Sequence, residues 1–247
     1  SLHVKTADES YYIGEAAPAK SYLNQEKILE VMLSSGTDAI HPGYGFLSEN
    51  DDFARLCEKN NINFIGPSAD SMNLCGDKMR CKAAMLKANV PTVPGSPGIV
   101  DDAQQAEKIA NEIGYPVLLK SVYGGGGRGI RLVTTDKELQ DGFDTVTSES
   151  IAAVGKSAII VEKFLEKTRH IEYQMCRDKH GNAVHLFERE CSIQRRNQKL
   201  IEQTPSPIVD QAKREEIGEL VVKAAEAVDY TNLGTAEFLR ADNGEFY

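Results

Sequence analysis

The sequence lacks a long apolar run, a paired cysteine motif and any low-complexity tract. A bilayer span needs roughly 18 consecutive apolar residues, and the first twenty residues do not have the basic-then-apolar layout of a signal peptide. We therefore expect no membrane segment and a location in the cytoplasm, or in the mitochondrial matrix if the protein comes from a eukaryote.

Cysteines that could form a disulfide framework are also missing. The five cysteines contain no CxxC pair and are odd in number, which fits free thiols in a reducing compartment. Basic residues are fewer than acidic ones: the chain has 28 lysines and arginines against 37 aspartates and glutamates, which gives a net charge of −9. Such a surface repels nucleic acid and anionic membranes, so an anionic ligand would need a local cluster of cations.

What is present is the composition of a globular α/β protein. The 247 residues are 41% apolar and 26% charged, enough to bury a sizeable core. From residue 20 to 66, helical and strand-like patterns alternate in βαβ order, with helices at 22–32 and 52–59 and short strands at 39–42 and 63–66. The chain opens without Met and closes on a strand-like Gly244–Tyr247, so we expect a fragment.

The middle of the chain predicts a small lobe of its own. Asp77 can cap a helix that runs to Lys87, with Asn89 as a left-handed stop, and the proline- and glycine-rich stretch 91–98 marks a lobe boundary. Beyond it the pattern predicts a helix from Asp101 and Asp102 to Gly114, strands at 116–121, 130–133 and 158–162, and a helix capped by Thr135.

The last third reads as an antiparallel sheet with one helix. Period-two alternation from 169 to 194 turns at 178–182, the pattern of a hairpin. One apolar face marks a helix around 217–228, and a final strand at 235–240 turns at Asp242-Asn243-Gly244.

A glycine run, residues 124–129 with Arg128 as its one other residue, lies between two predicted strands. Walker and dinucleotide-binding loops lead into a helix, so those motifs are excluded. Consecutive backbone N–H groups here can fold over phosphate oxygens, while a flexible β-turn is the alternative.

Two lysines and one glutamate are further candidates. Lys120 ends the apolar strand before the glycines and can clamp a phosphate, or it is a solvated strand-end lysine. Lys78 stands at a helix start, where the dipole disfavours a cation unless an anion is near. Glu237 sits inside an otherwise apolar strand, so it needs a partner, either a divalent metal or a salt bridge.

The polar face of the predicted hairpin carries His170, Glu172 and Gln174, because alternate residues share a face. The charged and amide-rich run from Glu188 to Lys199 follows. Its residue types suit small oxyanions, although a solvated face would have the same composition.

These pieces, in this order, resemble the biotin carboxylase branch of the ATP-grasp superfamily. The stretch His41–Asn50, HPGYGFLSEN, resembles a segment that is highly specific to that family. Other family-like segments follow at family-like spacing: Phe64–Pro67, Gly76–Lys78, Lys120 with its glycine run, Glu162–Leu165, Arg169–Glu172 and Gln194–Lys199. The resemblance implies an ATP-grasp domain over 76–247, with a glycine-rich lid at 92–165 and an incomplete lobe at 166–247, after a partial Rossmann-like domain over 1–75.

The resemblance also implies roles for single residues. Lys78 and Lys120 would hold ATP phosphates, and Gly126 and Gly127 would belong to the lid. The residues that would contact the adenine are Glu162, Lys163, Phe164 and Leu165. His170 and Gln194 would reach the ribose side, Glu237 resembles a ligand of Mg²⁺ or Mn²⁺, and Gln198 and Lys199 resemble residues that hold bicarbonate. Asn197 departs from the bacterial pattern, where a His is often found, so a phosphate contact there stays open.

By the same resemblance, bicarbonate attacks the γ-phosphate of ATP to give carboxyphosphate, and the carboxyl group then passes to biotin. The biotin would be carried by a biotin carboxyl carrier protein or domain, a carboxyltransferase subunit would be a further partner, and the intact enzyme would be a homodimer. The family's next strand, with a second metal-binding Glu and the Arg and Glu that serve bicarbonate and biotin, would follow Tyr247. We therefore expect residues 1–247 alone to bind ATP weakly and turn over poorly. The alternatives are another ATP-grasp ligase, such as a carbamoyl-phosphate-synthetase-like enzyme, and a non-catalytic nucleotide-binding fragment.

Overall fold

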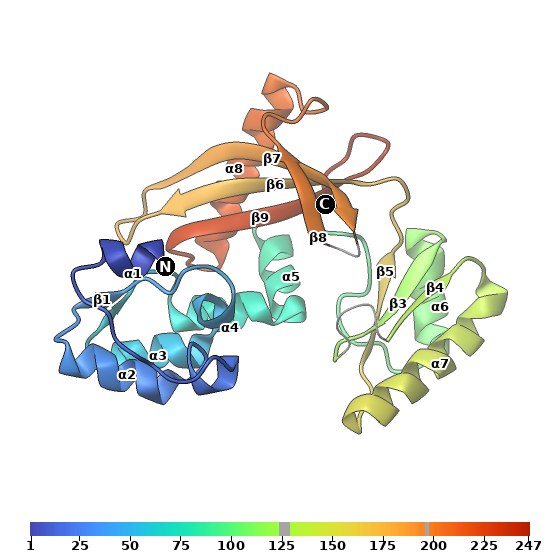
Figure 1. Cartoon of the computed structure of the whole chain (residues 1–247). Coiled ribbons are helices and arrows are strands. Elements are labelled where there is room, and N and C mark those ends of the chain that lie inside the picture. The colour runs from blue at the N-terminus through green and yellow to red at the C-terminus, as the bar shows by residue number, and fades with distance from the viewer. Residues whose placement is uncertain (124–128, 196–197) are drawn as a thin grey trace.

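The computed structural model describes residues 1–123, 129–195 and 198–247 (Figure 1). Within these residues the strands form three separate sheets, and each sheet has its own cluster of buried apolar side chains. The four-stranded sheet lies across the top of the view in Figure 1, with the N-terminal region below it on one side and a three-stranded lobe on the other. Helix α5, Lys78–Lys87, stands between the two lower regions.

The N-terminal region is built on the predicted βαβ order. Strands β1 (Ala39–Ile40) and β2 (Asn63–Phe64) pair in parallel and are joined through η2 (Phe46–Glu49) and α3 (Asp51–Lys59). The other helices are α1 (Leu2–Thr6), η1 (Pro18–Lys20), α2 (Gln25–Ser34) and α4 (Ala69–Gly76). Helix α2 begins three residues later than its apolar pattern predicts, because the Asn24 side chain caps it by accepting from the Lys27 amide at 3.0 Å.

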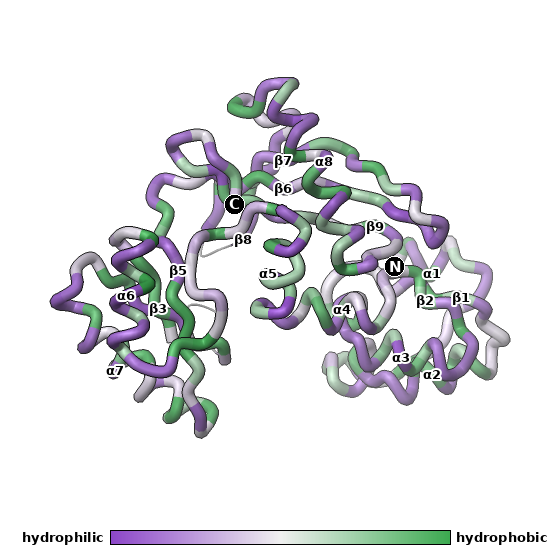
Figure 2. Tube along the Cα trace, turned by 180° about the vertical axis from the view of Figure 1, so that it is seen from behind, coloured by the Kyte–Doolittle hydropathy of each residue, from purple (hydrophilic) through white to green (hydrophobic). Residues whose placement is uncertain are grey.

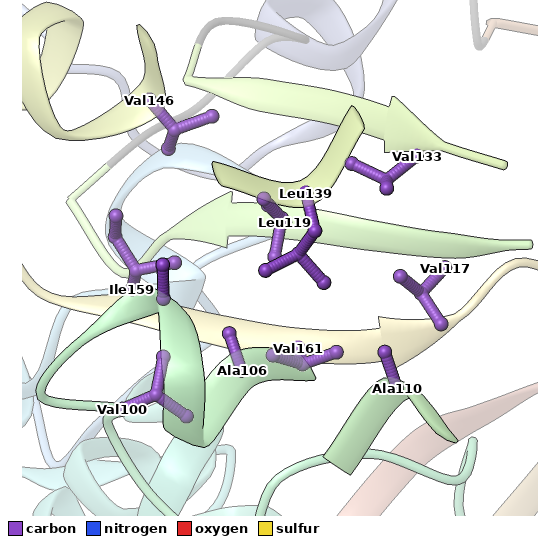
Figure 3. Close-up of a cluster of buried hydrophobic side chains, with 11 residues drawn as sticks. Val100, Ala106, Ala110, Val117, Leu119, Val133, Leu139, Val146, Ile159 and Val161 are labelled. Atoms are coloured by element: carbon purple, nitrogen blue, oxygen red, sulfur yellow. The ribbon is translucent and has the colours of Figure 1, made fainter. Parts of the chain in front are cut away.

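The three-stranded lobe contains the three predicted strands, which form an antiparallel sheet in the order β4-β3-β5. Strand β3 is Val117–Ser121, β4 is Ile130–Val133 and β5 is Ile159–Lys163. Helices α6 (Ala103–Ile113) and α7 (Asp136–Val154) supply apolar side chains that pack on the sheet, as Figure 3 shows for Ala106, Leu139 and Val146. Asp102 caps α6 as predicted, whereas Thr135 occupies the cap position of α7 without making the side-chain bond. Glu138 instead accepts from the amide and hydroxyl of Thr134 at 2.9 and 2.8 Å.

The four-stranded sheet has the order β8-β7-β6-β9 and is antiparallel throughout. Strands β6 (Arg169–Arg177) and β7 (Ala183–Arg195) form the predicted hairpin, β8 (Gln198–Gln203) follows, and β9 (Asn232–Arg240) pairs with β6. Helix α8 (Gln211–Ala227) buries Ile217 and Val221 against the sheet. The sequence pattern does not predict strand β8, because its charged and amide-rich residues resemble a solvated loop.

Hydrophobic and hydrophilic segments are interleaved along the coloured part of the trace in Figure 2. No helix of the described part of the chain is long and apolar enough to cross a membrane.

Candidate functional site

Helix α5 places Lys78 at the meeting point of two cavities. The Asp77 side chain caps the helix by accepting from the amides of Met79 and Arg80 at 3.0 and 3.1 Å, so Lys78 is fixed as its first residue. A small cavity of about 70 Å³ is lined by Lys78, Lys120 and Glu162, among others. A larger one of about 690 Å³ is lined by Lys78 together with His170 and Glu237. The predicted lysine pair and the predicted strand glutamate are therefore brought together around one helix start.

The small cavity concentrates positive charge. Lys82, one turn after Lys78, also lines it, and its Nζ lies 3.7 Å from Glu162 Oε1. The Lys120 ammonium donates to the other oxygen of Glu162. Among the described residues that line this cavity, three are lysines, Lys78, Lys82 and Lys120, and one is a carboxylate, Glu162. This excess of cations suits an anionic ligand.

The predicted adenine-contacting segment is divided between two environments. Glu162 faces the small cavity. The Lys163 ammonium instead donates to the carbonyls of Gly114 and Tyr115 at 2.9 and 2.8 Å. It therefore binds the end of α6, where free carbonyls favour a cation, and Phe164 and Leu165 are half-buried.

A polar cluster lies on β6, β7, β8 and β9 beside the larger cavity, and Glu172 is its centre. The Glu172 side chain is 3% exposed and accepts from Arg189 Nε at 2.6 Å and from the Lys199 ammonium. Lys199 Nζ also donates to Glu237 Oε1 at 2.7 Å. The cross-strand register explains this grouping, because β6 pairs Glu172 with Arg189 on one side and with Glu237 on the other.

The charges of this cluster shift one another. Burial raises the pKa of Glu172, but the hydrogen bonds from Lys199 and Arg189 outweigh it, and the net effect lowers the pKa below its usual value. Burial likewise opposes ionisation of Lys199, and the bonds to Glu172 and Glu237 raise its pKa overall. Both groups are therefore charged at neutral pH.

His170 and Gln194, predicted to serve the same side of a ligand, are in contact. Gln194 Nε2 lies 3.0 Å from His170 Nδ1 and donates to the carbonyl of Cys191 at 2.9 Å. Gln198 is exposed at the start of β8, opposite Arg195. The predicted lid glycines Gly126 and Gly127, and Asn197, lie outside the described residues.

One expectation about Glu237 is wrong and one residue was missed. Glu237 was expected to be a buried strand acid, but its side chain is 56% exposed, at an exposed position in the alternating burial pattern of β9. Its ion pair with Lys199 is the salt-bridge alternative. The buried acid is Glu172, and its period-two place between His170 and Gln174 is the signal that could have identified it.

The donor set of this cluster suits a divalent cation. Ligand atoms of His170, Glu172 and Glu237 lie within 4.8 Å of one another, and carboxylate oxygens are the ligands that Mg²⁺ prefers. His170 Nε2 is buried without a hydrogen-bond partner among the described residues and lies 3.4 Å from Glu237 Oε1.

Comparison with protein families finds two matches that together cover nearly all of the chain. Residues 1–72 match the model of the biotin carboxylase N-terminal domain. Residues 77–247 match that of the carbamoyl-phosphate synthase L chain, ATP binding domain.

Relatives and solved structures agree with these matches. A biotin carboxylase of Nostoc sp. is 51% identical over 100% of this chain and 55% of its own length. The biotin carboxylase complex with β,γ-ATP from Campylobacter jejuni superposes with a TM-score of 0.87 at 47% identity, over 100% of this chain and 55% of that one.

A third similar protein is the biotin carboxylase domain dimer of the Hydrogenobacter thermophilus 2-oxoglutarate carboxylase, in complex with MgADP, ADP and bicarbonate. It has a TM-score of 0.84 and 51% identity, over 99% of this chain and 54% of that one. The chain spans about half the length of the curated relatives it matches.

Proposed function

This chain belongs to the biotin carboxylase family, and from that membership we propose that the protein carboxylates biotin at the expense of ATP and bicarbonate. The observation that carries the proposal is the place of Lys78, which lines one cavity with Lys120 and another with Glu237. Cations for a polyphosphate and carboxylates for its metal ion are thereby joined at one helix start, as phosphoryl transfer requires.

We assign the triphosphate to the lysines and the nucleoside to the strand residues that follow. Lys78 and Lys120 would hold phosphate oxygens, and a phosphate that entered the small cavity would compete with Glu162 for the Lys120 ammonium. His170 and Gln194 would contact the ribose side, and residues 162–165 the adenine. Lys199 and Gln198 would hold bicarbonate. Gly126 and Gly127 would belong to the lid, and a phosphate contact of Asn197 stays open.

Glu237 is the proposed ligand of Mg²⁺ or Mn²⁺, with Glu172 beside it. When bound, the metal ion would neutralise charge on the phosphates of the nucleotide. The donor chemistry supports this assignment, and Lys199 supplies the positive charge at the two carboxylates in the present structure.

The substrates and partners of the whole protein are part of the same proposal. The H. thermophilus domain was crystallised as a dimer with MgADP, ADP and bicarbonate. A relative of this chain from the same organism is named the small subunit of 2-oxoglutarate carboxylase. We propose a homodimer that works with a biotin carboxyl carrier protein or domain and a carboxyltransferase subunit. We also propose the division at residues 75 and 76 and the lid at 92–165, and a reducing compartment such as the cytoplasm or mitochondrial matrix, which five free cysteines support.

The test is a pair of lysine substitutions in the three-stranded lobe. Lys120→Met should weaken MgATP binding at least tenfold, because a charge-assisted bond to phosphate is worth about 1.5–3 kcal/mol. Lys108→Met, on the exposed side of α6, is the matched control and should leave the affinity unchanged. Calorimetric titration with MgATP measures both, and equal affinities for the two variants would contradict the assignment.

A second assay separates this proposal from an ATP-grasp ligase with another acceptor. Bicarbonate-dependent ADP release should rise on addition of free biotin and not on addition of ammonia. Stimulation by ammonia alone would favour a carbamoyl-phosphate-synthetase-like enzyme, and MgATP binding that Glu237→Gln leaves unchanged would favour a non-catalytic nucleotide-binding module.

A further inference from the structure

Two cysteines meet where α4 ends and α5 begins. Cys75 is in the last turn of α4 and Cys81 is in the first turns of α5, with Asp77 as the one residue between the helices. Their thiols lie within hydrogen-bonding reach of each other. Both side chains are half-buried, and both line the larger cavity together with Lys78.

This environment differs from that of the buried cysteines. Cys57 and Cys191 are fully enclosed in their cores, where a thiol behaves as a small apolar side chain. Cys75 and Cys81 instead face a cavity large enough to admit small solutes. The pair therefore has both a neighbouring thiol and access to an oxidant, the two conditions for a thiol that is oxidised reversibly.

The two thiols are not equivalent. The hydrogen bond from Cys75 lowers the pKa of Cys81 to about 7, against the opposing effects of burial and of Asp77. The same bond raises the pKa of Cys75. Cys81 is therefore the thiolate of the pair, and Cys75 is the resolving thiol.

We propose that Cys75 and Cys81 are an oxidation site, which a hydroperoxide converts to a disulfide and a dithiol reductant restores. The Cys81 sulfur attacks the peroxide, the O–O bond breaks, and a sulfenic acid forms with release of hydroxide, or of an alkoxide from an organic peroxide. The Cys75 sulfur then attacks the Cys81 sulfur, the S–S bond forms, and the S–O bond breaks with loss of water. The two thiols give up two electrons and two protons, and hydrogen peroxide is reduced to two molecules of water.

The disulfide should alter the start of α5. Sulfur atoms joined by a bond of about 2.05 Å are much closer than two hydrogen-bonded thiols, so we expect the end of α4 and the first turn of α5 to shift toward each other. Lys78 is the first residue of that turn. The effect on the nucleotide, unlike the disulfide itself, rests on the proposed function. With Lys78 as a phosphate ligand, oxidation displaces that ligand and should weaken MgATP binding about tenfold, the loss expected for one charge-assisted hydrogen bond.

The experiment treats the purified protein with hydrogen peroxide, blocks remaining thiols with N-ethylmaleimide, and maps the tryptic peptides. Trypsin cuts after Lys59, Lys78, Arg80 and Lys82, so the disulfide would join peptide 60–78 to the dipeptide 81–82. We expect this linked species, short of two hydrogen atoms, to form with peroxide and to disappear with dithiothreitol.

Three variants complete the test. Cys75→Ser should leave Cys81 to oxidise to the sulfenic or sulfinic acid, which mass and a sulfenic-acid trap detect, and Cys81→Ser should abolish both products. Cys176→Ser, a half-buried cysteine of β6, is the matched control and should leave the linked peptide in place. Free, fully alkylated Cys75 and Cys81 after peroxide treatment, or a disulfide to another cysteine, would overturn the proposal. A linked peptide with unchanged MgATP affinity would confirm the disulfide and refute only its effect on the nucleotide.

Discussion

Replacing Glu172 with glutamine removes the negative charge at the centre of the polar cluster on β6. The carboxylate accepts from Arg189 and Lys199 and is 3% exposed. Glutamine keeps one acceptor oxygen, which can serve one of these two donors. Its amide nitrogen is itself a donor and would face the other cation, so one hydrogen bond is lost. The two cations, each 29% exposed, lose the charge that joins them, and Lys199 keeps only its bond to Glu237.

The structure fixes the size of this effect. Hydrogen bonds to charged groups contribute about 1.5–3 kcal/mol each, and breaking a buried ion pair by removing one partner costs about 3–5 kcal/mol. Because glutamine retains one of the two bonds and both cations are partly exposed, we expect Glu172→Gln to lower the free energy of opening of the four-stranded sheet by about 1.5–3 kcal/mol, the contribution of one such bond.

The matched control is Glu202→Gln. Glu202 Oε2 lies 3.8 Å from the same Arg189 Nε, but the Glu202 side chain is 48% exposed. Exposed ion pairs contribute about 0–1 kcal/mol, so this variant should lose less than 1 kcal/mol. Amide hydrogen exchange of peptides from β6 and β7, followed by mass spectrometry, measures the opening free energy in both variants. Equal losses in the two variants would refute the argument from burial.

The effect of Glu172→Gln should also depend on pH. The pKa of Glu172 is lowered in the folded state, so its contribution to stability is fully present above the unfolded value of 4.5 and is lost as the pH falls through the folded value. The difference in opening free energy between the wild type and Glu172→Gln should therefore be constant near neutral pH and narrow below 4.5. A difference that grows on acidification would contradict the direction of the pKa shift.

Two further substitutions test the scaffold around the site. Arg214 binds the fully buried Glu188 through Nε and Nη2 at 2.8–3.0 Å, so Arg214→Met should destabilise the four-stranded sheet by about 3–5 kcal/mol in the same exchange measurement, whereas Arg55→Met, which breaks the exposed pair with Asp70, should cost less than about 1 kcal/mol. Asp77→Ala removes the cap of α5 and should cost about 1 kcal/mol, seen as faster amide exchange in the first turn of the helix, and unchanged exchange there would show that the cap is dispensable.

Much of the fold follows from local patterns in the sequence. The hairpin of β6 and β7 carries alternating residues and a turn at 178–182, and the structure confirms both. The caps Asp77 and Asp102 and the left-handed Asn89 also form as predicted. Strand β8 could not be predicted in this way, because it is stabilised by pairing with β7, a contact that its own composition does not encode.

The sequence predicts which residues belong to the candidate site better than it predicts how they are arranged. Lys78, Lys120 and Glu237 are brought to adjoining cavities, although they are far apart in sequence. The burial of Glu172 depends on the pairing of β6 with both β7 and β9, and strand pairing is a long-range property. Lys163 shows the same limit, because its bonds to Gly114 and Tyr115 arise only when β5 packs beside the end of α6.

The three buried clusters draw their residues from successive stretches of the chain. Apolar side chains of the first lie between Ile28 and Met72, those of the second between Val100 and Val161, and those of the third between Ile171 and Phe246. Because each cluster of the described residues comes from one continuous stretch, the first two can begin to collapse during synthesis before the next stretch is made. The N-terminal region, the three-stranded lobe and the four-stranded sheet around Lys78 are therefore translated one after another, in that order.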